Sequence, residues 1–426
     1  MNIDFFVIRT FIYLMEKINF KRKYFNFEPS QIIDENNNNE SILSTVCMKI
    51  YKSNDKINII EYFESLKMIL LNNIDLKILE TFEKYNIIDI FIKTFLNQEY
   101  LIDFIYNFIA ICSAHEDEVS QYLISKNFLT FAKNDFNRVK NKNDIICLLS
   151  NICGCSVECR NAVLDAFSLE HLCSLFLSDS SLRNNLNVLF MNLTKYDIPS
   201  SQTQLLLCRV LTVILKNKMI INDDYLPTLW GLHYLLSSKY FQTDAISKNI
   251  IKYLSNILTD NNKAITILIF ADLLKKNINA LFSKKEFKMV FNVIKYDNSI
   301  NCKKAAAYCL RKFIKHIDQS EYLKIYIFIS SSIDNTNYIL KIEFIKIVCK
   351  IVNHSLDETI NTLFQNGIMD FLSSYASTFE CDEAIEKKLI ICYTRLISFI
   401  TNSSDEKIRA LILNIPVSIQ KHFYQN

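Results

Sequence analysis

Apolar residues recur every three to four positions through most of this chain, the spacing that places side chains on one face of an α-helix. Polar breaks of two or three residues, such as Ser125-Lys126-Asn127 and Asp179-Ser180-Ser181, interrupt the pattern. The helices that the pattern predicts include residues 104–112, 119–124, 129–131, 145–153, 156–166 and 169–177. One long apolar helix followed by two shorter ones is a recurring cycle. We therefore predict an all-α protein.

A longer period lies over the helical one. Asn151 and Asn192 are 41 positions apart, and Tyr234 follows 42 positions later. A period of about 40–47 residues is typical of armadillo and HEAT repeats, and three helices per repeat favour the armadillo type. We predict a right-handed α-solenoid of about nine to ten armadillo repeats over residues 44–426, preceded by a flexible tail at residues 1–43.

One position in each repeat is expected to face a shared surface, which we call the ladder. Projecting the period along the chain gives Ile69, Ala110, Asn151, Asn192, Tyr234, Phe270, Lys312, Lys350 and Cys392. Amide groups on such a ladder offer donors and acceptors to the backbone of an extended peptide. The ladder is therefore the predicted binding surface.

Composition agrees with a helical stack. Only 3 glycines and 4 prolines occur among 426 residues, whereas the turns of sheets depend on these residue types. The formal net charge of +3 is too small to indicate a nucleic-acid partner by itself. Lysine pairs such as Lys275-Lys276 favour solvated helix faces over an RNA track, which stays the alternative.

The 13 cysteines fall mostly on apolar helical faces, where a free thiol behaves as a small hydrophobe. We therefore expect a reducing compartment. Cys153, Cys155, Cys159, Cys173 and His171 invite a zinc interpretation, but no second C-x-x-C pair accompanies them, so no metal is expected. Phosphate-cradling loops and catalytic motifs are absent from the sequence, so we expect neither an enzyme nor a cofactor. No apolar run is long enough to predict a membrane span.

Three local sequences resemble the importin-α family of nuclear-import adaptors. They are Ser150-Asn151-Ile152-Cys153-Gly154, Met191-Asn192-Leu193-Thr194-Lys195 and Trp230-Gly231-Leu232-His233-Tyr234, which are similar to that family's third, fourth and fifth repeats. Residues 358–372 resemble part of the eighth repeat. The resemblance implies a groove that binds basic nuclear-localisation peptides, transport together with importin-β, and a location in both cytoplasm and nucleus.

The resemblance also implies roles for particular residues. In the family, a tryptophan and an asparagine four residues apart project from one face of each groove helix, and the indoles hold lysine side chains by cation–π contact. The residues of this chain that match are Asn151, Asn192, Trp230 and Tyr234, with Tyr106 and Tyr308 at tryptophan positions and Asp103 and Glu343 at glutamate positions.

The chain also departs from the family. Cys147 and Val188 replace tryptophans, and Lys312, Lys346 and Lys350 occupy the C-terminal site, which is therefore expected to be lost. The short basic cluster Lys21, Arg22 and Lys23 is at most a reduced importin-β-binding segment, and recruitment of importin-β stays open. An armadillo scaffold that holds protein partners without transporting cargo is the alternative function.

Overall fold

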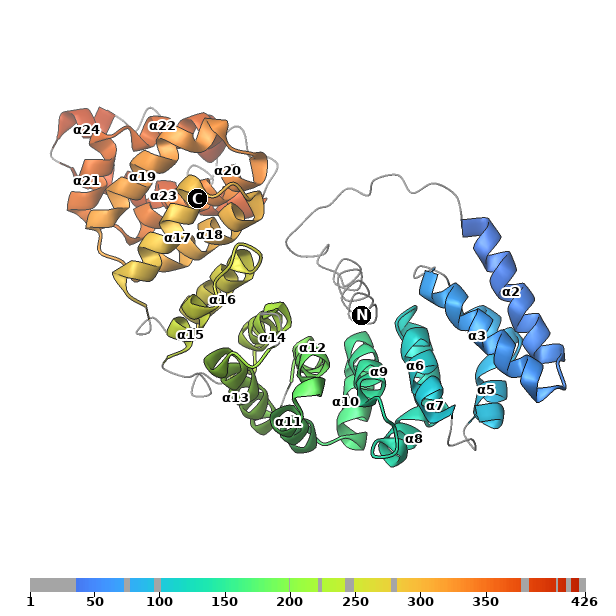
Figure 1. The fold of residues 1–426 in the computed structure, drawn as a ribbon. Coiled ribbons are helices and arrows are strands. Elements are labelled where there is room, and N and C mark those ends of the chain that lie inside the picture. Colours follow the sequence, from blue (N-terminus) through green and yellow to red (C-terminus); the bar gives the residue numbers. More distant parts are fainter. Residues whose placement is uncertain are drawn as a thin grey trace. The chain divides into compact units, whose positions relative to one another are not determined.

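The computed structural model describes residues 36–72, 77–95, 101–198, 200–220, 224–241, 249–276, 282–376, 383–403, 405–410 and 415–420. Within these ranges every regular element is a helix (Figure 1). The helices follow one another along the chain and pack mainly on their near neighbours in sequence. The described residues therefore form an all-α protein consistent with a helical-repeat solenoid.

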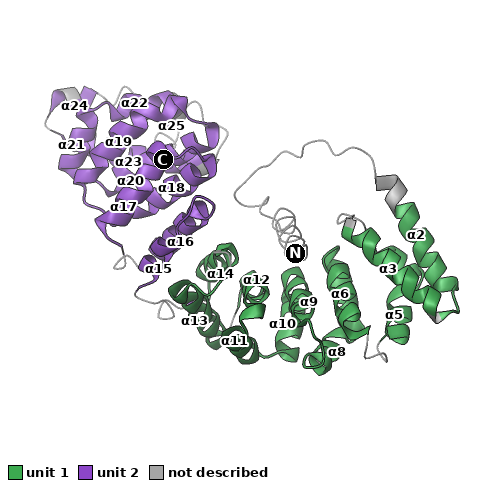
Figure 2. Cartoon of the chain, in the orientation of Figure 1, with its two compact units in different colours: residues 1–240 green, residues 241–426 purple. Residues whose placement is uncertain are grey.

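The chain divides into two compact units, residues 1–240 and residues 241–426, coloured green and purple in Figure 2. We expected one continuous array after residue 43. Each unit is a row of long helices covered by other helices, so each is described separately.

Unit 1 is built on a row of four long helices, each of which packs on the next (Figure 1). The row consists of α6 (Ile102–Cys112), α9 (Lys142–Cys155), α12 (Arg183–Thr194) and α14 (Leu226–Ser237). The helices that cover it are α7 (Asp117–Ser125), α8 (Phe128–Asp135), α10 (Val157–Ala166), α11 (Leu169–Ser178) and α13 (Ser201–Asn217). The unit begins with α2 (Asn36–Lys52), α3 (Lys56–Asn72), α4 (Leu79–Lys84) and α5 (Ile87–Phe95).

Unit 2 contains a second row of packed helices, made by α16 (Lys263–Lys275), α18 (Ile300–Phe313), α20 (Tyr338–His354) and α23 (Glu383–Asn402). The accompanying helices are α15 (Ile250–Asn256), α17 (Lys284–Tyr296), α19 (Ser320–Ser332), α21 (Asp357–Gln365), α22 (Ile368–Ala376), α24 (Glu406–Ala410) and α25 (Val417–Gln420). The row helices bury most of their large apolar side chains, because neighbouring helices cover them on both sides.

Left-handed residues mark the same joint in several repeats. Asn86, Asn127 and Gly367 have φ values of 52°, 62° and 80°. They lie directly before α5, α8 and α22, where one short helix ends and the next begins. Asparagine and glycine tolerate this conformation best. The recurring asparagine and glycine breaks in the sequence are therefore the points where the chain turns between paired short helices.

The three-helix cycle that we predicted is not uniform. Among the described residues, α13 is the single helix between α12 and α14, α17 is the single helix between α16 and α18, and α19 with one 3-10 turn stands between α18 and α20. In α19 the buried Tyr322, Ile325, Tyr326 and Ile329 continue at helical spacing without an asparagine or glycine break. Without a residue that favours the left-handed conformation, the segment stays one helix.

The beginning of the repeat region also differs from the prediction. Helix α2 begins at Asn36, inside the segment that we assigned to the tail, and it buries Leu43, Cys47 and Ile50 on one face. Those apolar residues at helical spacing extend the helix into the asparagine run. The basic cluster Lys21, Arg22 and Lys23 lies outside the described residues.

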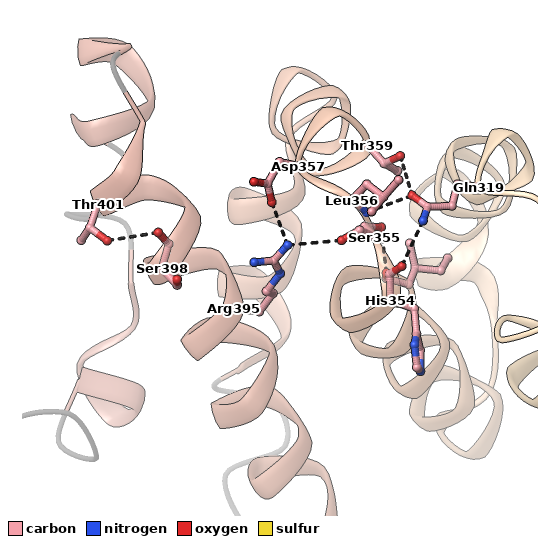
Figure 3. A network of polar contacts seen from close by, with 10 residues as sticks. Gln319, His354, Ser355, Leu356, Asp357, Thr359, Arg395, Ser398 and Thr401 are labelled. Atoms are coloured by element: carbon pink, nitrogen blue, oxygen red, sulfur yellow. Dashed lines mark hydrogen bonds and ion pairs between the residues drawn. The ribbon is translucent and has the colours of Figure 1, made fainter.

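Polar side chains join successive repeats of unit 2 at the end of α20, as Figure 3 shows. Gln319 Oε1 accepts hydrogen bonds from the Leu356 backbone N–H and the Thr359 hydroxyl, both at 2.9 Å. From the other side, Arg395 donates to Asp357 at 2.7 Å. The turn after α20 is thereby held by residues from the repeats before and after it.

Candidate functional site

Asn151 and Asn192 occupy equivalent places on α9 and α12, and each reaches back to the preceding row helix. Asn151 Nδ2 donates to Ala110 O at 3.1 Å and to Ser113 Oγ at 3.0 Å. Asn192 Nδ2 donates to Ser150 O at 2.8 Å and to Ser150 Oγ at 3.0 Å. The oxygens that accept these bonds lie near the C-terminal ends of α6 and α9. Both amides therefore clamp one repeat to the next.

This role limits what the two asparagines can offer to a ligand. An amide nitrogen has two hydrogens, and both are used in each case. Asn151 is half-buried, which leaves its Oδ1 as the atom for a peptide N–H. Asn192 is only 7% exposed, and its Oδ1 is buried with no hydrogen-bond partner. The ladder is therefore more inward-facing at Asn192 than at Asn151.

Aromatic rings gather on α14 at the next ladder position. The ring centroids of Trp230 and Tyr234 lie 5.9 Å apart, and His233 is 5.4 Å from the indole. Trp230 is 9% exposed, whereas His233 and Tyr234 are half-buried. Burial raises the pKa of Tyr234, so its hydroxyl stays protonated at neutral pH. The four-residue spacing places both rings on one face of the helix, as the sequence predicted.

Carboxylates occur at the start of this row. Asp103 accepts hydrogen bonds from the backbone N–H groups of Lys140 and Asn141 at 2.9 and 3.2 Å, just before α9. Asp144 accepts from Asn107 Nδ2 at 3.2 Å, and burial raises the pKa of its carboxyl group. Asp144 and Asn107 were not singled out from the sequence. Their positions, seven residues before Asn151 for Asp144 and three residues before Ala110 for Asn107, about two helical turns and one, were the available signal.

One predicted tryptophan position and two ladder positions differ from the expectation. Tyr106 is fully buried, and its hydroxyl donates to Asp135 at 2.8 Å, so the ring faces the interior of its own repeat. The half-buried neighbour Asn107 lies on the exposed face of α6 instead. Phe270 and Cys392 are also fully buried. Loop lengths vary between repeats, so the projected positions are displaced by one or more residues. Each residue turns a helix by about 100°, so a displaced position lies on a different face.

Tyr308 and Glu343 lie on the row of unit 2 and are surrounded by cations. Lys312 Nζ is 5.0 Å from the centre of the Tyr308 ring, and the Arg311 guanidinium is 5.2 Å from it. Glu343 pairs with Arg311 and with Lys346, both at 3.3 Å. A ring and a carboxylate that already hold cations are poorly placed to receive those of a basic peptide.

Lys350 repeats the clamp of the asparagines with a different group. Its Nζ donates to Arg311 O at 2.7 Å, across to the preceding row helix. Burial, followed by the charges of Lys312, Lys315, Arg311 and Lys388, lowers the pKa of Lys350 to about 8. At this ladder position a lysine ammonium therefore makes the kind of bond that the asparagine amides make in unit 1, and its positive charge is half-buried.

The cysteines of the described residues have the properties of core residues. Burial raises the pKa of Cys147 and Cys155 to about 12, so both are thiols at neutral pH. Among the described residues no group of three or more His, Cys, Asp or Glu side chains could hold a metal ion. Within the same residues, no helix combines the length and the apolar character that crossing a bilayer requires.

Comparisons with known proteins give the fold only. No protein-family model matches the chain, and no curated protein does. An engineered protein, whose crystal structure comes from the Northeast Structural Genomics Consortium, is similar with a TM-score of 0.63. The match covers 89% of this chain and 98% of that one at 12% sequence identity. This likeness supports the sequential all-α arrangement and leaves the family and the function open.

Proposed function

We propose that this chain is an armadillo-type nuclear-import adaptor that binds basic nuclear-localisation peptides on the ladder of unit 1. The observation that carries the proposal is the Trp230–Tyr234 pair, with ring centroids 5.9 Å apart, on the helix next to the one that bears Asn192. Together with Asn151, these residues form a series of amides and aromatic rings on successive packed helices. The resemblance of the surrounding sequences to importin-α is the reason for proposing basic nuclear-localisation peptides as the ligand.

The binding chemistry follows from the side chains. The half-buried ring of Tyr234 and the small exposed part of Trp230 would attract a lysine ammonium by cation–π contact, worth about 0.5–2 kcal/mol each. Asn151 Oδ1 accepts a hydrogen bond from the peptide backbone, and the Asp103 and Asp144 carboxylates add attraction for a basic side chain at the start of the row. A groove with two ring contacts binds more weakly than one with an indole at every repeat, so micromolar affinity is expected.

The test uses Trp230, the only tryptophan of the chain, as the probe. Titration of the full chain with a capped pentalysine peptide should shift the tryptophan emission saturably, and added salt should weaken the effect. Tyr234→Ala should weaken binding about 2- to 30-fold, the equivalent of one cation–π contact. Arg209→Ala, an exposed substitution on α13, serves as the control and should leave the affinity unchanged.

A second candidate is an armadillo scaffold that holds protein partners without carrying cargo. The observation that favours it is the engagement of all the amide hydrogens of Asn151 and Asn192 within the fold. This candidate predicts that pentalysine leaves the emission of Trp230 unchanged and that Tyr234→Ala has no effect on peptide affinity. Either result would contradict the import-adaptor proposal. Location in cytoplasm and nucleus, and recruitment of importin-β by Lys21, Arg22 and Lys23, belong to the first candidate only.

A further inference from the structure

The row helices of unit 2 carry a cluster of positive charge. We name the six residues the basic ladder: Arg311, Lys312, Lys315, Lys346, Lys350 and Lys388. They belong to α18 and the turn after it, to α20, and to α23, three helices that pack in succession. Lys315 and Lys388 are exposed, and the other four are half-buried.

The basic ladder is compact enough for its charges to act on one another. Lys350 Nζ lies 2.7 Å from Arg311 O, so α18 and α20 approach closely at this rung. After burial, the charges of Lys312, Lys315, Arg311 and Lys388 lower the pKa of Lys350. Burial and then Arg311 likewise lower the pKa of Lys312. Charges from both neighbouring helices therefore converge on the half-buried ammonium of Lys350.

Few carboxylates offset this charge. Glu343 pairs with Arg311 and Lys346 at 3.3 Å each, and it also favours the charged form of Lys312. Asp272 of α16 acts on Lys312 as well. The six cations of the basic ladder, with Lys275 of α16 beside Lys312, thus face two carboxylates, whereas the whole chain carries a formal net charge of only +3. The excess is a local property of this face.

We infer that the basic ladder binds an extended acidic peptide segment of a partner protein. Carboxylates of such a segment would relieve the repulsion among the half-buried cations, which is stronger there than in bulk water. Successive row helices are about 8–10 Å apart, a distance that an extended chain covers in about three residues. The cations of each row helix can therefore contact a different acidic side chain of the peptide. This inference is independent of basic-peptide binding by unit 1.

The same features favour a peptide over single-stranded nucleic acid. Binding of single strands relies on aromatic faces on which bases stack. The aromatic residue beside these cations is Tyr308, and Lys312 and Arg311 already lie over its ring at 5.0 and 5.2 Å. Glu343 in the middle of the basic ladder would repel a continuous phosphate backbone. Carboxylates on flexible side chains can instead reach individual lysines.

The affinity test uses the full chain and a fluorescein-labelled, capped decapeptide of alternating glutamate and serine, followed by fluorescence anisotropy. Binding is expected at low salt and should weaken about tenfold or more near 300 mM salt. The double variant Lys315→Glu, Lys388→Glu should weaken binding at least about tenfold, because it reverses two exposed charges of the basic ladder. Both residues are exposed, so the fold should tolerate the change.

A matched control distinguishes binding at the basic ladder from an effect of net charge alone. The double variant Lys285→Glu, Lys288→Glu makes the same change in net charge at exposed positions of α17, which lies outside the row. It should change the affinity less than about twofold. Equal losses in the two double variants, or no binding at low salt, would overturn the inference. An RNA decanucleotide that binds the basic ladder more tightly than the peptide and displaces it would also overturn it, in favour of nucleic acid.

Proton uptake gives a second readout. The pKa of Lys350 is about 8 in the free protein, because burial and the neighbouring cations disfavour its charge. A bound carboxylate favours that charge, so the pKa should rise on binding and the complex should take up protons near pH 8. Binding should correspondingly weaken between pH 7 and pH 9. Calorimetry in two buffers of different ionisation enthalpy measures the uptake, and Lys350→Met should remove most of it. Binding without uptake would mean that the peptide does not reach Lys350.

Discussion

Single polar side chains of the ladder connect repeats in the same way whatever their chemistry. Asn151, Asn192 and Lys350 each donate to a backbone carbonyl near the end of the preceding row helix. Ala110 and Arg311 lie in the last turn of their helices, where carbonyls lack an intrahelical partner, whereas Ser150 lies about one turn earlier and gains a second donor. The amides make these bonds without charge. The ammonium of Lys350 adds a half-buried positive charge, as Lys195 does in unit 1, where it donates to Gly154 O.

At the residue scale, Asn192→Ala should lower the free energy of unfolding by about 1–3 kcal/mol, because it removes two buried hydrogen bonds to Ser150. Urea unfolding followed by circular dichroism measures the change. Asn185→Ala is the matched control. Its amide donates to Asn143 Oδ1 at 2.8 Å from a half-buried position, where water can replace it, so a loss below about 1 kcal/mol is expected. Equal losses would show that Asn192 does not clamp the repeats.

The sequence predicted the position of the amides but not their orientation. The period of about 41 residues singled out Asn151 and Asn192, and both lie on row helices. Their donors point to the preceding repeat, and this direction depends on how closely two helices approach. For the same reason the sequence placed Tyr106 at a peptide-facing tryptophan position, whereas Tyr106 is fully buried and the adjacent Asn107 is half-buried.

At the element scale, the two kinds of glycine have different functions. Gly367 has a φ of 80° at the joint between α21 and α22, a conformation that disfavours a side chain. Gly154 lies in the last turn of α9, where an added Cβ would make ordinary contact with the Asn192 side chain at 3.4 Å. Gly367 therefore allows the turn between α21 and α22, whereas Gly154 lowers the stability of α9.

These two glycines give opposite predictions for the same substitution. Gly367→Ala should destabilise the protein by about 1 kcal/mol, because alanine is strained in the left-handed region. Gly154→Ala should stabilise it by about 0.4–1 kcal/mol, because alanine loses less conformational freedom in a helix. Thermal unfolding of both variants beside the parent protein measures the shifts. Equal shifts in one direction would contradict this distinction.

At the scale of the whole molecule, two units repeat the same architecture with different surfaces. The row of unit 1 carries amides, two carboxylates and an aromatic pair, whereas the row of unit 2 carries six cations. Helices in each row pack on their immediate neighbours, so local changes should spread only a short distance. Binding of the two proposed ligands, which have opposite charge, should therefore be independent.

Hydrogen exchange tests this independence. Asn192→Ala should speed amide exchange in α9, α12 and α14, whose contacts it weakens, and leave α18, α20 and α23 unchanged, because stability in a repeat array is set by neighbouring interfaces. Lys350→Met should alter exchange in α18, α20 and α23 only. Faster exchange throughout the chain in either variant would indicate a single cooperative array instead.

The sequence by itself determined the helices, since apolar spacing and the asparagine and glycine breaks are local properties of the chain. The three-helix cycle matches the repeats that contain α7–α8, α10–α11 and α21–α22, whereas α13, α17 and α19 are each the single described α-helix between two row helices. Only the tertiary structure decided which ladder residues are exposed. One residue turns a helix by about 100°, so the facing side chain depends on loop lengths and helix packing. Packing also brought Lys350 beside Arg311, Lys312 and Lys388, which are separated by up to 77 positions in the chain.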